Sequence, residues 1–335
     1  MRKTASFLAG LAALALTVTS YAPNVFADQP DAAQGNAFHA IIATGTTAGA
    51  PSKGDTATPN RPAATSNLVY HTSGSVQVGT HHTYAIYWGS SFSTNYKSII
   101  NGYFANVAAD SGHSSNVYYS DTQYYQTISG VKTFISYSEQ YKGSWSDTVL
   151  PSSSGCSSTA GGTTKCVSDA QVQAEVTKAI NANGWPRGLT NQYFVFLGNG
   201  ISTCYDSSSC AFTAFCAYHS NYGSGSGNTL YANMPYTGHN LSACSGASGS
   251  PNGDAGADAT ISVTSHEANE TITDALGNAW YDRSGNENGD KCAYNYGTRL
   301  GTINGGDYNQ NIGSGHYELQ QEWSNYSSRC VLTGK

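Results

Sequence analysis

The chain has 335 residues, a net charge of −6 and only 11% charged residues, well below the roughly 25% of an ordinary soluble domain. Its acidic balance and few basic side chains argue against nucleic acid or an anionic membrane surface as a partner. Its polar character comes from Gly, Ser, Thr and Asn together with 24 Tyr residues, a composition that suits an extracellular protein.

The first 27 residues have the pattern of a secretory signal peptide. Arg2 and Lys3 precede an apolar run, and the small residues Val25 and Ala27 precede Asp28. The apolar run is shorter than the roughly 20 residues of a transmembrane helix. We therefore expect cleavage after Ala27 and a secreted, extracellular protein without a membrane span.

Residues 28–66 are rich in Ala, Thr, Gly and Pro and have almost no periodic apolar residues. Such a segment buries too little apolar surface to offset the entropy of ordering, which predicts a flexible leader or pro-segment. Residues 67–335 are expected to form one domain, in a monomeric protein.

Eight cysteines form an even set, which favours four disulfides in an oxidising compartment over metal thiolates. Spacing alone does not select the connectivity. The hypothesis is that neighbours in sequence pair: Cys156 with Cys166, Cys204 with Cys210, Cys216 with Cys244, and Cys292 with Cys330.

Apolar and aromatic patterns predict the first elements of the domain. Residues 83–88 read as a buried strand, and apolar residues at helical spacing from Tyr96 to Val107 predict a helix. Residues 116–119 and 132–137 read as strands of the same sheet.

A second helix is predicted from a capping box. Ser168 can cap the helix and Gln171 can complete the box, while Gly184 gives the stop signal. Residues 192–198 then read as a core strand.

Residues 229–236 read as a further strand, and Pro235 suggests an edge position. The strand–helix–strand rhythm favours an α/β (α+β) fold with a mixed central sheet flanked by helices.

The stretch "SHEANETITD" is the strongest candidate for a functional site. A helix over residues 258–274, capped by Asp258, would place His266 and Glu270 on one face about 6 Å apart along the axis, close enough to hold one metal ion. The stretch looks like the metal-binding helix of a zinc protease whose second histidine is replaced by Glu270, and Glu267 has the position of the general base in that helix.

A third ligand is expected in the acidic loop "NAWYDRSGNENGDKC". Asp290 is favoured because Cys292 would restrict its position, and Glu287 comes next, ahead of Asp282. Asp274 is interpreted as a helix-end or supporting residue, because it lies too far along the helix to share a metal with the histidine.

Two other readings compete with a zinc site. The stretch can be a plain amphipathic helix, and the alternating oxygen donors of residues 282–288 resemble an irregular calcium loop. His219, expected between strands, is a candidate for lining a cleft or for a structural hydrogen bond, and His316 is a candidate for stabilising an oxyanion.

The segments "FCAYHS", "YANMPY", "SHEANETITD", "NAWYDRSGNENGDKC" and "QQEWSN" resemble secreted microbial members of the phosphate-induced protein family, which includes the plant Exordium proteins. The resemblance covers roughly residues 67–335. It implies an extracellular, zincin-like domain with His266 and Glu270 as ligands, Glu267 as base and an acidic residue of 282–290 as third ligand.

The sequence thus predicts a secreted metal-dependent hydrolase, a zinc endopeptidase acting on extended polypeptide that pairs with an edge strand near residues 229–236. The alternative is a non-catalytic extracellular protein with structural calcium that contacts a cell-wall component, as the resemblance to plant members implies.

Overall fold

The computed structural model describes residues 39–43, 66–246 and 249–335. The expected signal peptide and most of the expected leader lie outside these residues. None of the helices in the described ranges is both long and apolar enough to cross a membrane.

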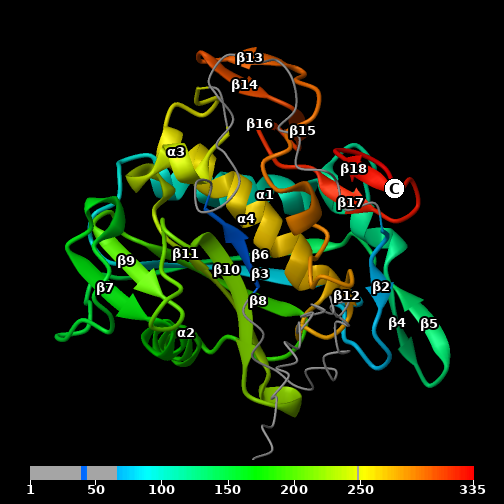
Figure 1. Ribbon diagram of the computed structural model, residues 1–335, viewed down its shortest axis with the longest axis horizontal. Helices are drawn as coiled ribbons and strands as arrows, with labels where there is room; N and C mark the ends of the chain where they lie inside the picture. Colours follow the sequence, from blue (N-terminus) through cyan, green and yellow to red (C-terminus); the bar gives the residue numbers. More distant parts are fainter. Residues whose placement is uncertain (1–38, 44–65, 247–248) are drawn as a thin grey trace, which may run out of the picture. The chain divides into compact units, whose positions relative to one another are not determined.

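Six strands form a mixed central sheet (Figure 1). In chain order they are β1 (His39–Ile42), β3 (His81–Trp88), β6 (Glu139–Asp147), β8 (Asn191–Leu197), β10 (Phe215–Tyr222) and β11 (Thr229–Met234). Across the sheet the order is β1-β10-β11-β8-β3-β6. The last four strands of that order are parallel, whereas β10 is antiparallel to β11 and to β1. The expected mixed sheet is therefore confirmed.

Four α-helices accompany the sheet: α1 (Tyr96–Ala109), α2 (Asp169–Asn183), α3 (Leu241–Cys244) and α4 (Ala255–Thr273). The described ranges also contain short 3-10 helices: η1 (Val117–Gln123), η2 (Ala160–Gly162), η3 (Gly225–Gly227), η4 (Thr237–His239) and η5 (Asp290–Cys292).

The remaining strands form two-stranded ribbons. These pair β2 (Val69–Tyr70) with β12 (Trp280–Tyr281), β4 (Tyr125–Ile128) with β5 (Val131–Phe134), β7 (Lys165–Ser168) with β9 (Ile201–Cys204), β13 (Gly301–Ile303) with β14 (Gly306–Tyr308), β15 (Gln310–Ile312) with β16 (Gly315–Tyr317), and β17 (Glu322–Ser324) with β18 (Arg329–Val331).

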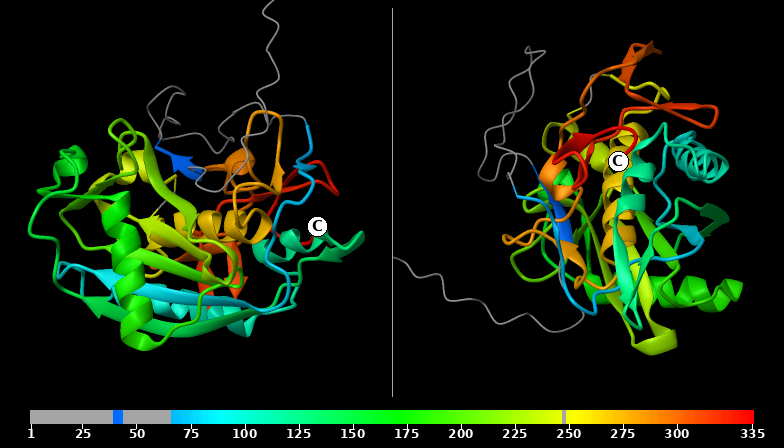
Figure 2. Two further views of the ribbon diagram at one scale, coloured as in Figure 1. Left: turned by 90° about the horizontal axis from the view of Figure 1, so that it is seen from below. Right: turned by 90° about the vertical axis from the view of Figure 1, so that its right-hand side faces the viewer.

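Alternation along the strands directs side chains to two helical layers (Figures 1 and 2). Phe194 and Phe196 of β8 pack against Phe104 of α1. On the other face, the Tyr218 hydroxyl of β10 donates to Asp169 at the start of α2. Helices α1 and α4 therefore cover one face of the sheet and α2 covers the other.

Helix α4 is surrounded by protein, because all its residues from Gly256 to Thr273 are buried. Its polar side chains bond back to its own carbonyls: Thr264 Oγ1 donates to the carbonyl of Thr260, and Asn269 Nδ2 to that of Ser265. A polar sequence can therefore occupy the interior, and α4 is buried on every side and not on one apolar face alone.

Several expected elements are confirmed. The helix after Tyr96 is α1, and α2 has the capping box of Ser168 with Gln171 and a left-handed Gly184 at its end. The strands expected over 83–88 and 192–198 are β3 and β8. Each of these segments has a strong local signal.

Other expectations are wrong. Residues 117–123 form η1 rather than a strand, because the Asn116 side chain accepts from the Tyr118 N–H and caps a helical turn. β5 pairs only with β4, in a hairpin outside the central sheet. α4 is capped by Asp254, whereas Asp258 accepts from the Asn252 N–H.

Strand β11 lies inside the sheet, between β10 and β8, so the edge position suggested by Pro235 is wrong. Pro235 follows the last residue of the strand and takes no donor away from it. The edge strand on this side is β1, within residues 28–66, so that segment does not consist only of a flexible leader.

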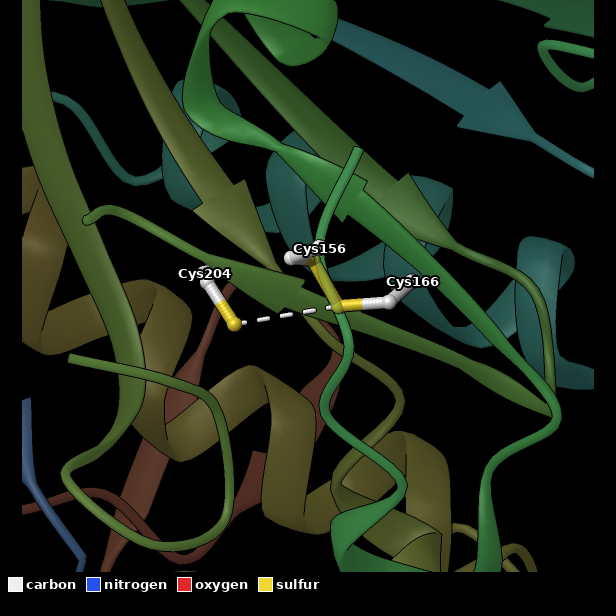
Figure 3. A group of neighbouring side chains, drawn as sticks. All are labelled: Cys156, Cys166 and Cys204. Carbon is white, nitrogen blue, oxygen red and sulfur yellow. Dashed lines mark hydrogen bonds between the residues drawn. A yellow bond between two sulfur atoms is a disulfide. The ribbon is translucent and has the colours of Figure 1, made fainter. Parts of the chain in front are cut away.

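All four expected disulfides are present. The first two approach each other beside the β7–β9 ribbon, where Cys166 Sγ lies 3.7 Å from Cys204 Sγ (Figure 3). Because these sulfurs are oxidised, the cluster of Cys156, Cys166 and Cys204 is a covalent staple and offers no thiolate to a metal.

Candidate metal centre

Helix α4 carries three of the predicted site residues in its second half. His266, Glu267 and Glu270 are fully buried, and α4 packs against β10, β11 and α1. Residues 266 and 270 are about one turn apart, so their side chains share a face. His266 Nε2 lies 3.0 Å from Glu270 Oε1.

His219 reaches the same cluster from the sheet. It lies within β10, not between strands as expected, and alternation turns it toward α4. Its Nδ1 is 3.1 Å from Glu267 Oε2 and 3.5 Å from Glu270 Oε2. The run "FCAYHSNY" contained the signal, since an unbroken strand there would have given this histidine a definite face.

The loop after α4 supplies two carboxylates. The Asp290 N–H donates to Glu270 Oε1 at 2.9 Å, and Asp290 Oδ1 lies 3.8 Å from His266 Nε2. Glu287 Oε2 lies 3.7 Å from His219 Nε2. The fold therefore brings His266, Glu270, Asp290 and Glu287 together and adds His219 to them, whereas Asp282, the remaining candidate of the loop, belongs to neither donor group.

Two overlapping donor groups result, one of His266, Glu270 and Asp290, the other of His219, Glu270 and Glu287. In each group one ligand atom per residue lies within 4.8 Å of the others. Glu270 belongs to both groups, and its two oxygens face different histidines.

The first group fits a divalent metal ion. Ligand atoms about 2.0–2.1 Å from a tetrahedral zinc ion lie about 3.3 Å apart, and the two distances from His266 Nε2, 3.0 and 3.8 Å, bracket that value. Both ring nitrogens of His266 are buried, and neither makes a hydrogen bond within the described part of the chain. His266 Nε2 and Glu270 Oε1 are therefore close to each other without hydrogen-bond geometry, which is the arrangement that two ligands of one metal ion would have.

Gly289 keeps the space beside this group clear. A Cβ at this position would lie 2.7 Å from His266 Nδ1 and 2.9 Å from Glu270 Oε1. Any larger residue would displace the two side chains, so the glycine allows the loop to approach the helix closely.

The buried histidines and carboxylates of the cluster shift each other's pKa values. Burial opposes protonation of His266, but Glu270 and other carboxylates outweigh it and raise the pKa of His266 to about 9. Burial likewise opposes ionisation of Glu270, but His266 and His219 hold its pKa below the ordinary value. Burial raises the pKa of Glu267.

Among the alternating oxygen donors of residues 282–288, those of Asp282 and Asn288 make hydrogen bonds within the protein. The Asp282 carboxylate accepts from Ser284, from Asn286 and from the ammonium group of Lys291. Asn288 accepts from Thr273 through its side-chain oxygen. These oxygens bond to the loop and to α4, and the histidine donors of the cluster suit zinc better than calcium. The calcium loop stays a prediction.

Two other predicted residues lie apart from the ligands. Asp274 ends α4, where its Oδ1 accepts from the N–H groups of Asn278 and Ala279, a helix-end position. His316 lies in β16, where it contacts Asn311 and Tyr308.

Sequence reasoning missed a further acidic pair beside the cluster. Asp121 of η1 and Glu322 of β17 are buried, and burial, reinforced by neighbouring carboxylates, raises both pKa values well above the ordinary range. Asp121 Oδ1 accepts from Asn288, in the loop that carries Asp290. Neither residue has a local motif, because only the tertiary fold places them together.

Strand β1 covers Glu267. The Ile41 N–H donates to Glu267 Oε1 at 3.4 Å, while the other oxygen is bonded to His219. A surface hollow of about 290 Å³ lies at the start of α4, lined by residues such as Leu241 and Ala255 that do not belong to the cluster. The histidines and glutamates of the cluster are buried, whereas Asp290 is partly exposed.

Protein-family models, curated proteins and solved structures were compared with the chain, and none of them matches it. The resemblance to the phosphate-induced protein family stays a prediction.

Proposed function

We propose that this chain is a secreted metal-dependent hydrolase that cleaves polypeptides, with zinc as its metal. The observation that carries the proposal is the convergence of His266, Glu270 and Asp290 around His266 nitrogens that make no hydrogen bond within the described residues. A buried helix that placed these groups together only for packing would satisfy those nitrogens.

His266, Glu270 and Asp290 would hold the metal, which when bound polarises a substrate carbonyl and acidifies water. Glu267 would take up the proton released as water attacks, at a carboxylate oxygen. His219 orients Glu267 through the bond to Oε2. The raised pKa of Glu267 brings its basicity closer to that required near neutral pH.

Metal analysis of the secreted protein tests the proposal first. We expect about one equivalent of zinc in the wild type and none in His266→Ala. His113→Ala is the matched control, because that imidazole is exposed and bonded to Asp110. Calcium alone, unchanged in His266→Ala, would contradict the zinc site.

Activity tests the second half of the proposal. Glu267→Gln should retain zinc and lose hydrolysis of an unfolded protein substrate by about 10²-fold or more, because the amide cannot accept the proton. Equal hydrolysis by wild type and Glu267→Gln would overturn the assignment of the base.

A second function is favoured by the burial of the histidines and glutamates of the cluster. A non-catalytic extracellular protein could use the same metal only to fasten α4 to the loop of Asp290. Zinc bound tightly in a chain that hydrolyses nothing, with and without the leader, would select this function.

A further inference from the structure

Strand β1 occupies the edge of the sheet next to the candidate metal centre. The order of strands makes β10 the last strand before β1, so without β1 the main-chain groups on the outer side of β10 would lose their strand partner, while those on the other side stay paired with β11. β10 also carries His219, which pairs in register with His39. Figure 1 shows β1, the blue strand, beside α4.

Main-chain atoms of β1 make several of its described contacts. Besides the ladder with β10, the Ile41 N–H reaches Glu267, the Ile42 carbonyl accepts from the Tyr294 hydroxyl at 2.9 Å, and the Ala43 N–H donates to Ala214. These contacts are available to any extended peptide. Among the β1 side chains whose positions are described, only that of Ile41 is buried. Ile41 is fully buried, whereas Ile42 is 54% exposed.

We propose that the β10 edge is a binding site for extended polypeptide and that β1, as part of the leader, occupies it as an intramolecular competitor. An antiparallel peptide with an aliphatic residue at the position of Ile41 would replace β1. Occupation by β1 engages Glu267, so the leader holds the site closed. The inference rests on the proposed function in one respect: only if the protein is a hydrolase is the bound polypeptide its substrate.

This assignment also replaces the expected substrate edge near residues 229–236. β11 is paired on both sides and offers no free ladder, whereas β10 loses its outer partner when β1 leaves. A peptide there would extend past His219 and over Glu267, within reach of the metal ligands on α4.

Peptide binding to the full-length secreted chain tests the proposal. The probe is a labelled peptide of residues 38–44, "FHAIIAT", and a scrambled peptide is the control. Ile41→Asp places a charge at a buried position next to Glu267 and should release β1. Ile128→Asp, on the exposed part of β4, is the matched control for the substitution itself.

We expect the Ile41→Asp chain to bind the probe at least tenfold more tightly than wild type or Ile128→Asp, and not to bind the scrambled peptide. Equal binding by all three chains, or no binding by a folded Ile41→Asp chain, would overturn the inference. If Ile41→Asp does not fold, a protease site introduced within residues 44–65 supplies the second test. After cleavage, the probe should displace the β1 fragment, and retention of the fragment against excess probe would refute the proposal.

The two proposals fail separately. Probe binding without zinc or hydrolysis would keep the peptide edge and remove the enzyme. Hydrolysis that is equal in wild type and folded Ile41→Asp would keep the enzyme and remove the closing role of β1.

Discussion

At the scale of single residues, Gly289 offers the sharpest probe of the candidate centre. In Gly289→Ala the new methyl group would lie against His266 Nδ1 and Glu270 Oε1. We expect a loss of about 1–3 kcal/mol in the free energy of unfolding and at least a tenfold weaker affinity for zinc. Thermal unfolding and a competition titration with a chelating dye measure the two effects.

Gly102→Ala is the matched control, because a Cβ there meets no atom within 4 Å and the residue lies inside α1. It should leave zinc affinity unchanged and stabilise the protein by up to about 1 kcal/mol through helix propensity. Unchanged zinc affinity in Gly289→Ala as well would show that the loop does not approach the ligands as described.

Glu175 predicts a pH dependence that is independent of the metal centre. It lies on α2 beside Asp147, and burial, followed by the charge of Asp147, raises its pKa to about 8 from an ordinary value of 4.5. Between these values the folded protein holds a proton that the unfolded chain has lost. The free energy of unfolding therefore falls as pH rises through this window.

Glu175→Gln should remove this contribution, because the amide does not ionise. We expect the variant to gain about 1–2 kcal/mol over wild type at pH 8, after allowance for solvent screening, and little at pH 4.5. Thermal unfolding at the two pH values measures the gain. An equal difference between variant and wild type at both values would contradict the prediction.

At the scale of elements, the Cys292–Cys330 disulfide links η5 to β18 and holds the loop that carries Asp290. It closes 38 residues of sequence, which corresponds to about 4 kcal/mol of chain entropy. The double variant Cys292→Ala, Cys330→Ala should lose up to that amount of stability and bind zinc more weakly. Chemical unfolding and metal analysis measure the two losses.

The Cys156–Cys166 disulfide is the control, because it joins the β7 region, away from the ligands, across only 10 residues. Its removal should cost about 3 kcal/mol at most and leave zinc content intact. Equal loss of zinc in both double variants would mean that general destabilisation, and not the position of Asp290, causes the effect.

At the scale of the whole molecule, chelation should loosen the fold. The metal would neutralise carboxylates from α4 and from the loop after it, so its removal leaves buried like charges near each other. We expect excess EDTA to lower Tm by several degrees, since about 4 kcal/mol is available at a ligand concentration 1,000 times Kd.

Two controls accompany the chelation experiment: addition of metal ions after EDTA, and the His266→Ala variant. Added zinc should restore Tm and added calcium should not, and His266→Ala should respond to neither EDTA nor zinc. A wild-type Tm that EDTA leaves unchanged would argue against a metal that contributes to folding.

The sequence by itself determined those features that depend on neighbours along the chain. The capping box of Ser168 begins α2 and the left-handed Gly184 ends it, because both signals act within one helical turn. The spacing of His266 and Glu270 put them on one face of α4 for the same reason. The four disulfides join consecutive cysteines two by two along the chain, as the predicted pairing expected.

Only the tertiary structure decided which strand lies at the edge, which histidine joins the cluster and what covers it. β1 enters the sheet from a segment with little periodicity, because β10 supplies the hydrogen-bond ladder that its own sequence does not specify. His219, Asp121 and Glu322 meet α4 or its loop through long-range packing, and no spacing along the chain encodes such contacts. Burial raises the pKa values of Asp121 and Glu322, and neighbouring carboxylates raise the pKa of His219 against the effect of burial. Both causes are properties of the folded molecule.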